Sequence, residues 1–127
     1  MIRPLVVYVA GPYSSDPEYN TKVAMDFGSA LIAEGVAPIV PHLNHYMHLR
    51  VPQEYETWMS VDFTLIRRCN LLVRLPGHSP GADREVAFAL GARIPVVEVA
   101  PVGFNDVVPQ NVKDEIARLT KESNPWF

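Results

Sequence analysis

Glu85 is the residue whose type and surroundings best suit catalysis, and it lies within residues 71–90. An apolar run at the start of this stretch predicts a short buried strand, which a proline and a glycine end. Ser79 is a good N-cap and Pro80 suits the first helical position, so a helix begins here and carries Glu85 in its early turns. Free backbone N–H groups and the helix dipole favour an anion at such a start. The stretch therefore predicts an anion-binding turn with a carboxylate beside it.

Three histidines, His42, His45 and His48, follow one another at three-residue steps, which is compatible with metal ligands. On a helix, however, each step of three residues turns the side chain by about 60° in the same sense, so the three would not share one face. Pro41 and the lack of a clean period favour an irregular loop over residues 42–52 instead. We therefore expect no metal and no cofactor, and expect these imidazoles to contact a ligand or to cap a pocket.

Apolar runs separated by turn residues predict the secondary structure. Asp16 or Ser15 can cap the first helix, with Pro17 at its first position, and Gly91 is the expected C-cap of the helix that carries Glu85. The predicted strands cover residues 5–10, 36–40, 71–75 and 94–99. The predicted helices cover residues 17–35, 52–68, 80–91 and about 112–121, the second of them starting at Pro52.

Strands that alternate with helices favour an α/β fold with a parallel sheet and right-handed crossovers. We expect a single-domain flavodoxin/Rossmann-like three-layer sandwich over residues 1–127, with a four- to five-stranded parallel sheet and helices on both faces. In such sheets ligands bind beyond the carboxyl ends of the strands, where the strand order reverses. This rule places residues 11–15, 42–48 and 77–85 around one crevice.

The composition is that of an ordinary soluble globular protein, and it excludes several classes. The 127 residues suffice for one domain with its own core, and a formal net charge of -3 argues against a general nucleic-acid binder. The lone Cys69 excludes an internal disulfide and fits a reducing compartment. No apolar run approaches the roughly 20 residues of a membrane span, and no signal-peptide core precedes Ser14. We therefore expect a cytoplasmic protein with no membrane partner.

Several of these features occur together, and in the same order, in one known family. The opening strand with its loop (VYVAGP, residues 7–12), the mid-chain Asp62, and the run SPGADRE from Ser79 to Glu85 resemble the nucleoside 2-deoxyribosyltransferase superfamily. This superfamily also contains nucleoside 5'-monophosphate N-glycosidases. The resemblance covers about residues 5–99 and implies an enzyme that acts on a small nucleoside or nucleotide.

The resemblance implies roles for three side chains. Glu85 would be the nucleophile that attacks the anomeric carbon of a ribose or deoxyribose, releases the base and forms a glycosyl-enzyme ester. Asp62 would lie beside it and assist proton transfer to the base, while Tyr8 would contact the nucleophile or the sugar. Two carboxylates about 5 Å apart would allow such a retaining mechanism. The expected substrate-binding residues are Gly11, Tyr13, Ser14, Ser15, His42, His45, Gly77, Ser79, Gly81 and Arg84.

Ser79 distinguishes two branches of the superfamily. Transferases that act on free nucleosides tend to carry an aspartate at this position, whereas the monophosphate hydrolases carry a serine. A hydroxyl and free N–H groups can donate to a phosphate that a carboxylate would repel. We therefore expect cleavage of the N-glycosidic bond of a nucleoside 5'-monophosphate, with Ser14 or Ser15 as a further donor. Base exchange between deoxynucleosides and a nucleotide-binding sensor without turnover are the alternatives.

Each candidate also has a purely structural interpretation. Glu85 could be a solvated first-turn carboxylate, Asp62 could be an exposed residue paired with Arg67 or Arg68, and Tyr8 could be a core residue. Asp83 and Arg84 could likewise form a solvated helix face.

The aromatic residues Tyr55 and Trp58 are most simply core or dimer contacts. The resemblance implies a homodimer or a higher homo-oligomer in which one subunit closes the site of the next.

Overall fold

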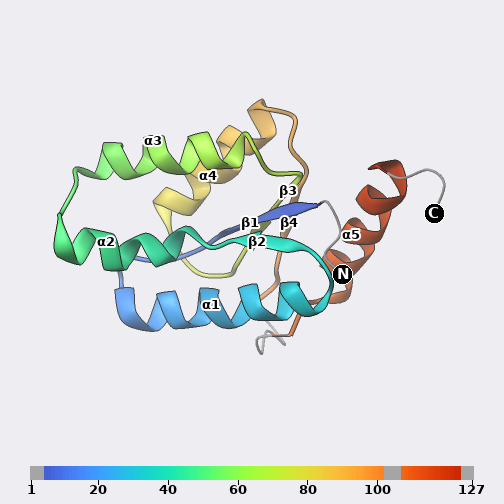
Figure 1. Cartoon of the computed structure of the whole chain (residues 1–127), viewed down its shortest axis with the longest axis horizontal. Helices are drawn as coiled ribbons and strands as arrows, with labels where there is room; N and C mark the ends of the chain where they lie inside the picture. Colours follow the sequence, from blue (N-terminus) through green and yellow to red (C-terminus); the bar gives the residue numbers. More distant parts are fainter. Residues whose placement is uncertain (1–4, 102–106, 124–127) are drawn as a thin grey trace.

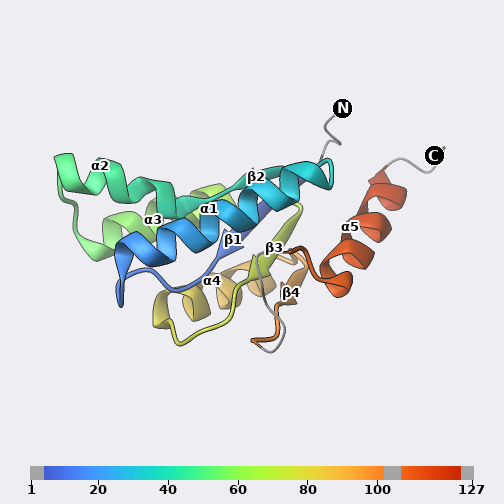
Figure 2. The same ribbon diagram turned by 90° about the horizontal axis from the view of Figure 1, so that it is seen from below.

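The computed structural model describes residues 5–101 and 107–123, which form an α/β sandwich (Figures 1 and 2). Its sheet has four parallel strands in the order β2-β1-β3-β4. The predicted fold class is therefore confirmed, with four strands in the described part of the chain. The strands are β1 (Val6–Ala10), β2 (Ala37–Ile39), β3 (Leu71–Arg74) and β4 (Val96–Glu98). The helices are α1 (Pro17–Ala33), η1 (a 3-10 turn, Pro41–Leu43), α2 (Asn44–Arg50), α3 (Tyr55–Ile66), α4 (Pro80–Gly91) and α5 (Gln110–Ser123).

Alternation along β1 assigns the helices to the two faces of the sheet. Val7 and Val9 pack in one buried cluster with apolar side chains of α1 and α5. Tyr8 and Ala10 point to the opposite face and pack with apolar side chains of α3 and α4. Because successive side chains of a strand point to opposite sides, one fully apolar strand supplies both cores.

Two helix starts form as their capping residues predict. The Asp16 side chain caps α1 by accepting from the Tyr19 N–H at 3.3 Å, and Pro17 occupies the first helical position. Ser79 caps α4 in the same way by accepting from the Ala82 N–H at 3.1 Å. Each cap satisfies an N–H group that the first turn of a helix leaves without a partner.

The expected irregular loop over residues 42–52 is wrong, because this segment forms η1 and α2. The helix shows no amphipathic period because it exposes several of its apolar side chains, including Tyr46 and Met47, and buries His45. This is the reverse of the pattern by which a sequence identifies a surface helix.

Two helix boundaries also differ from the prediction. The third helix begins at Tyr55 with Glu54 as N-cap, so Pro52 precedes it instead of starting it. Gly91 is the last residue of α4 and not its cap, because the C-cap is Ala92. The left-handed residue after this helix is Arg93, with φ of 62°.

The strand order reverses between β1 and β3, since β2 lies on one side of β1 and β4 lies beyond β3. This arrangement makes the carboxyl ends of β1 and β3 the place where the fold positions a ligand. In the described ranges, no helix is both long enough and apolar enough to cross a membrane.

Candidate functional site

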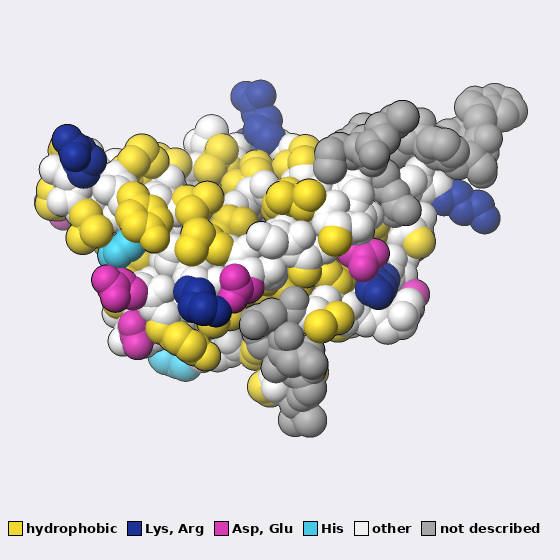
Figure 3. Space-filling model, turned by 60° about the horizontal axis from the view of Figure 1, so that its bottom comes forward, with side chains coloured by type: hydrophobic (Ala, Val, Ile, Leu, Met, Phe, Trp, Pro, Cys, Tyr) yellow, Lys and Arg dark blue, Asp and Glu magenta, His cyan; other side chains and the backbone are white. Residues whose placement is uncertain are grey.

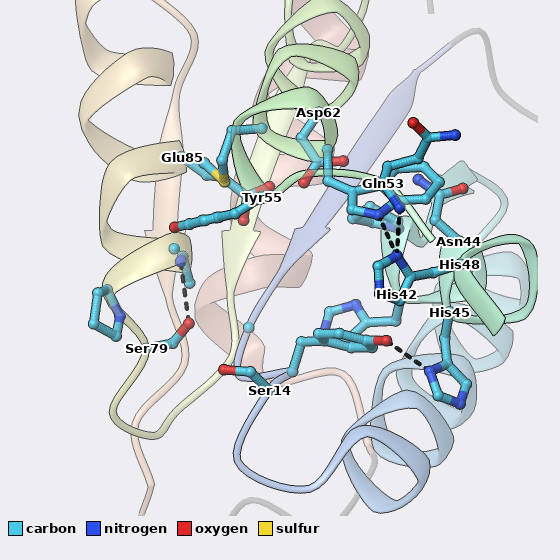
Figure 4. A pocket seen from close by; sticks show the side chains of 18 residues that line it. Ser14, His42, Asn44, His45, His48, Gln53, Tyr55, Asp62, Ser79 and Glu85 are labelled. Atoms are coloured by element: carbon cyan, nitrogen blue, oxygen red, sulfur yellow. Dashed lines mark hydrogen bonds between the residues drawn. The ribbon is translucent and has the colours of Figure 1, made fainter. Parts of the chain in front are cut away.

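A pocket of about 570 Å³ lies beyond the carboxyl ends of β1 and β3 (Figure 4). The three loop regions that the strand rule placed around one crevice all contribute to it, together with α3. Figure 4 shows Ser79 and Glu85 on one side, Asn44, His48 and Gln53 on the opposite side, and Asp62 between them. The lining residues are Gly11, Tyr13, Ser14, Pro41, His42, Asn44, His45, His48, Gln53, Tyr55, Trp58, Met59, Asp62, Ser79, Pro80, Gly81, Ala82 and Glu85.

Glu85 is a buried carboxylate and not a solvated first-turn residue, since it is only 5% exposed. It reaches the pocket from the second turn of α4. The hydroxyl group of the fully buried Tyr8 donates a hydrogen bond to its Oε2 atom. Tyr8 does not line the pocket itself, so the structure places it behind the carboxylate that does.

Asp62 approaches the same carboxylate from α3. It lines the pocket, and its side chain interacts with Glu85 and Tyr8. Among the described residues, no ion pair joins it to Arg67 or Arg68, so the structural alternative for this residue does not hold. Helix α3 and helix α4 pack side by side on one face of the sheet, which brings the two acids together.

The two carboxyl groups compete for one proton. Burial raises the pKa of Glu85, and the negative charge of Asp62 raises it further. Burial also raises the pKa of Asp62, and hydrogen bonding to Glu85 and to Tyr8 opposes that rise. Two adjacent acids, one buried and one half-buried, cannot easily both ionise, and this favours one shared proton at a pH at which free carboxyl groups are ionised.

The turn between β3 and α4 forms the other half of this wall. The Ser79 hydroxyl accepts from Ala82 and so retains its own hydrogen for donation. The Asp83 N–H bonds to the Ser79 carbonyl and Pro80 has no N–H, which leaves the Gly81 N–H as the free donor of this helix start. Gly77 lies outside the pocket and serves the turn, because its φ of 118° and a Cβ position 2.8 Å from Pro12 suit only glycine.

Arg74 holds the turn from behind. Its guanidinium group donates to the carbonyl groups of Leu75, Gly77 and Ser79, and forms an ion pair with Asp83 at 2.9 Å. Asp83 is therefore paired instead of merely solvated. The sequence prediction missed Arg74, although a charged residue at the end of an apolar strand is a signal of it.

Two predicted substrate contacts point elsewhere. Arg84 forms a two-bond ion pair with Glu56, at 2.8 and 3.1 Å, and does not line the pocket. The Ser15 hydroxyl accepts from the Asn20 side chain at 3.1 Å and also lies outside the lining. Both residues are thus occupied in local contacts.

The predicted contacts on the η1 and α2 side do line the pocket. His42 is buried and bonds through Nε2 to the Pro12 carbonyl at 3.0 Å, and burial lowers the pKa of its imidazole. A neutral His42 therefore donates from Nε2, which leaves Nδ1 as a buried acceptor without a partner in the described part of the chain. Tyr13 bonds through its hydroxyl to His45 Nδ1 at 2.6 Å and packs edge-on against both imidazoles.

His48 belongs to the pocket in a defined tautomer. Its Nδ1 atom accepts from the Trp58 indole N–H at 2.8 Å and from the Gln53 backbone N–H at 3.2 Å. Both partners can only donate, so the neutral ring carries its proton on Nε2. Tyr55 and Trp58, which the sequence marks as core or dimer contacts, both line the pocket. Tyr55 is not a core residue, because it is 48% exposed.

The pocket contains further residues that the sequence did not reveal, among them Asn44, Gln53 and Met59. Gln53 and Met59 lie outside the three regions that the strand rule placed at the crevice, and Asn44 lies inside one of them but was not singled out. The three histidines make separate contacts, and within the described ranges no three His, Cys, Asp or Glu side chains are grouped as metal ligands.

A family model described as a domain of unknown function (DUF7768) matches residues 5–99. The matched range includes Tyr8, Asp62, Glu85 and the turn before α4. No curated protein matches the chain.

Proposed function

Since the chain belongs to the DUF7768 family, we propose its activity from the site and from the resemblance to nucleoside 2-deoxyribosyltransferases: it cleaves the N-glycosidic bond of a nucleoside 5'-monophosphate. The products are the free base and the sugar 5-phosphate. The observation that carries this proposal is the buried Glu85, which lines the pocket. Tyr8 is hydrogen-bonded to Glu85, and Asp62 lies beside it.

The single proton of the acid pair suits a retaining mechanism. The Glu85 carboxylate attacks the anomeric carbon, and the bond from that carbon to the base nitrogen breaks with its electron pair going to the base. Asp62 delivers the shared proton to the departing base. A water molecule then attacks the same carbon, Asp62 accepts its proton, and the ester bond to Glu85 breaks. Atoms and charges balance, and the pair again holds one proton.

Tyr8 supports the ionised state of the nucleophile. Its hydroxyl donates to Glu85, and this hydrogen bond lowers the pKa that burial and Asp62 raise. Hydrogen bonding to a carboxylate stabilises its charged form. For this reason we propose that Tyr8 acts in catalysis together with Glu85 and Asp62.

The 5'-phosphate is proposed to lie against the turn before α4. The Ser79 hydroxyl and the Gly81 N–H are donors on the same wall as Glu85, and Figure 4 shows the Ser14 hydroxyl directed toward the side of Ser79. A helix start supplies the partial positive charge that favours a phosphate. In this arrangement Ser79 faces the 5' end of the substrate and Glu85 faces its anomeric carbon.

The base is proposed to lie on the side of the pocket that α2 and the start of α3 form. Asn44 and Gln53 each present a side-chain amide there, and the Trp58 ring supplies an apolar surface. Amide groups offer both a donor and an acceptor to the edge of a base, while aromatic rings stack on its face.

A second candidate is base exchange between free deoxynucleosides by the same chemistry. The observation that favours it is that no lysine or arginine of the described residues lines the pocket, so the site offers a 5'-phosphate no direct cationic contact. A nucleoside without a phosphate group needs no such cationic contact. In this case a second base, and not water, would attack the glycosyl ester.

We also propose that the protein forms a homo-oligomer. Apolar side chains are exposed around α2, and Figure 3 shows hydrophobic side chains gathered toward the end of the molecule where α2 lies. Exposed apolar patches of this kind mark association surfaces. The residues are Leu43, Tyr46, Met47, Leu49 and Val51.

The deciding experiment screens common nucleosides and their 5'-monophosphates for released base, with Glu85→Ala as control. Release from monophosphates that Glu85→Ala abolishes supports hydrolysis. Adding a second base to a deoxynucleoside tests exchange, which yields the swapped nucleoside. Saturable binding with no product from any compound would replace both enzymes with a nucleotide-binding sensor.

A further inference from the structure

Arg74 is the one buried lysine or arginine among the described residues, at 8% exposure, and it does not line the pocket. Its Nη1 atom donates to the Leu75 and Gly77 carbonyls, the latter at 2.9 Å. Its Nη2 atom donates to the Ser79 carbonyl at 3.5 Å and to Asp83 at 2.9 Å. All four hydrogens of the two terminal nitrogens are therefore committed to the turn and to the start of α4.

These bonds determine which groups the turn can present to a ligand. A carbonyl oxygen that faces the guanidinium group cannot face an anion, and three carbonyl groups between Leu75 and Ser79 face Arg74. These three oxygens thus face Arg74 and not the wall on which the Ser79 hydroxyl and the Gly81 N–H lie. A fork of five donors suits this task better than a single ammonium group.

The positive charge of Arg74 is only partly neutralised. Asp83 is its one carboxylate partner in the described ranges, and the Asp83 side chain is 68% exposed and therefore screened by solvent. Burial and Asp62 raise the pKa of Glu85, and the charge of Arg74 opposes part of that rise, so the charge acts on a group that lines the pocket. A buried cation behind the turn can attract an anion that it does not touch.

We propose that Arg74 is a positioning residue for the 5'-phosphate of the substrate, holding the turn open to the phosphate and supplying its positive potential from behind. The proposal rests on the proposed function for the identity of the ligand. Asp83 competes with that phosphate for the charge of Arg74. Removing the carboxylate of Asp83 should therefore strengthen phosphate binding, which a merely structural Arg74 would not do.

The test titrates wild type and Asp83→Asn with ribose 5-phosphate, 2-deoxyribose 5-phosphate and inorganic phosphate, none of which has a glycosidic bond to cleave. The matched control is Glu56→Gln, which removes an equally exposed carboxylate from the other arginine pair of α4, that of Arg84. We expect Asp83→Asn to bind the sugar phosphates about two- to fivefold more tightly, and Glu56→Gln to bind them as wild type does. With turnover, Asp83→Asn should lower KM for the monophosphate and change kcat less than about twofold.

Arg74→Lys keeps the charge with fewer donors and should weaken sugar phosphate binding by about tenfold. Equal affinities of Asp83→Asn and Glu56→Gln, or weaker binding by Asp83→Asn, overturn the proposal even if the enzyme hydrolyses monophosphates. Tighter binding by Asp83→Asn alone, in a protein that releases no base, supports Arg74 while the proposed hydrolysis fails. A wild-type protein that binds none of the three probes also overturns it.

Discussion

At the scale of single residues, the site depends on one proton shared between Glu85 and Asp62 in a buried environment. Neither side chain is unusual alone. Their chemistry arises because burial and mutual repulsion keep one of them protonated where an exposed pair would be ionised. The Tyr8 hydroxyl then decides how readily Glu85 ionises.

Tyr8→Phe should move both limbs of the pH profile of kcat/KM to higher pH. The Tyr8 hydrogen bond lowers the pKa of both acids, so its loss lets both values rise. At neutral pH we expect base release to fall by about 10- to 100-fold. Tyr19→Phe removes the hydroxyl of an exposed tyrosine and is the control. A Tyr8→Phe profile that stays in place or moves to lower pH would contradict the role of this hydroxyl.

Glu85→Gln should stabilise the fold at high pH more than at low pH. The pKa of Glu85 in the folded protein lies above its ordinary value of 4.5. At a pH between the ordinary pKa and the folded pKa, the folded state therefore keeps a proton that the unfolded chain has lost. Wild-type stability therefore falls as pH rises through this window, whereas glutamine imitates the protonated acid throughout. The gain in unfolding free energy should be about 1–3 kcal/mol larger near pH 8 than near pH 5.

Urea unfolding at the two pH values measures this difference. Glu18→Gln, at an exposed position of α1, should show almost none of it. A gain for Glu85→Gln that is the same at both pH values would mean that burial does not hold a proton on the pair.

At the scale of elements, the strand–turn–helix unit of β3 and α4 combines stability and recognition. Ser79 ends the turn, caps the helix and lines the pocket, while Arg74 organises the same turn from the other side. The cap and the candidate phosphate contact are one side chain, so a substitution must be chosen to separate them.

Ser79→Asp should separate the two roles. Aspartate keeps the N-cap acceptor, so the unfolding free energy should stay within about 0.5 kcal/mol of wild type. A carboxylate at the turn repels a phosphate, so kcat/KM for a nucleoside 5'-monophosphate should fall at least about tenfold, with free nucleosides unaffected. Steady-state kinetics on a matched nucleotide and nucleoside check this preference.

Ser79→Ala and Asp16→Ala provide the matched comparison, because each removes the N-cap of one helix and only Ser79 lines the pocket. Each should lose about 1 kcal/mol of stability, and only Ser79→Ala should lose monophosphate turnover. If Ser79→Asp retained full activity on monophosphates, the turn would not be the phosphate site.

At the scale of the whole molecule, the pocket and the exposed apolar side chains share one helix. Helix α2 turns His45 and His48 toward the pocket and leaves Tyr46 and Met47 exposed. Association through this surface would place a second chain beside the site.

We therefore expect sedimentation to show a species larger than the monomer, which Met47→Glu should shift toward the monomer. A charge in an apolar contact is costly to bury. Ile32→Glu, at a similarly exposed position on α1, should leave the assembly unchanged. A wild-type protein that sediments strictly as a monomer would exclude association through α2.

The sequence was sufficient where one local pattern specifies one local structure. Apolar runs predicted the strands, Asp16 and Ser79 predicted the starts of α1 and α4, and the alternation of elements predicted the parallel sheet. The same order of elements placed the crevice at the strand ends, since this follows from topology alone. Residues 11–15 and the turn before α4 were located for that reason.

Tertiary structure alone decided which side chains face one another. The burial of Glu85, its bond to Tyr8 and the approach of Asp62 depend on how α3 and α4 pack, with 22 residues of sequence between the two acids. Helix α2 escaped prediction because it exposes apolar residues, and the pocket roles of Gln53 and Trp58, which follow it in the chain, were missed. A local sequence pattern indicates which side chains of a segment are buried or exposed. A site depends on contacts between segments, and only the packed fold brings these together.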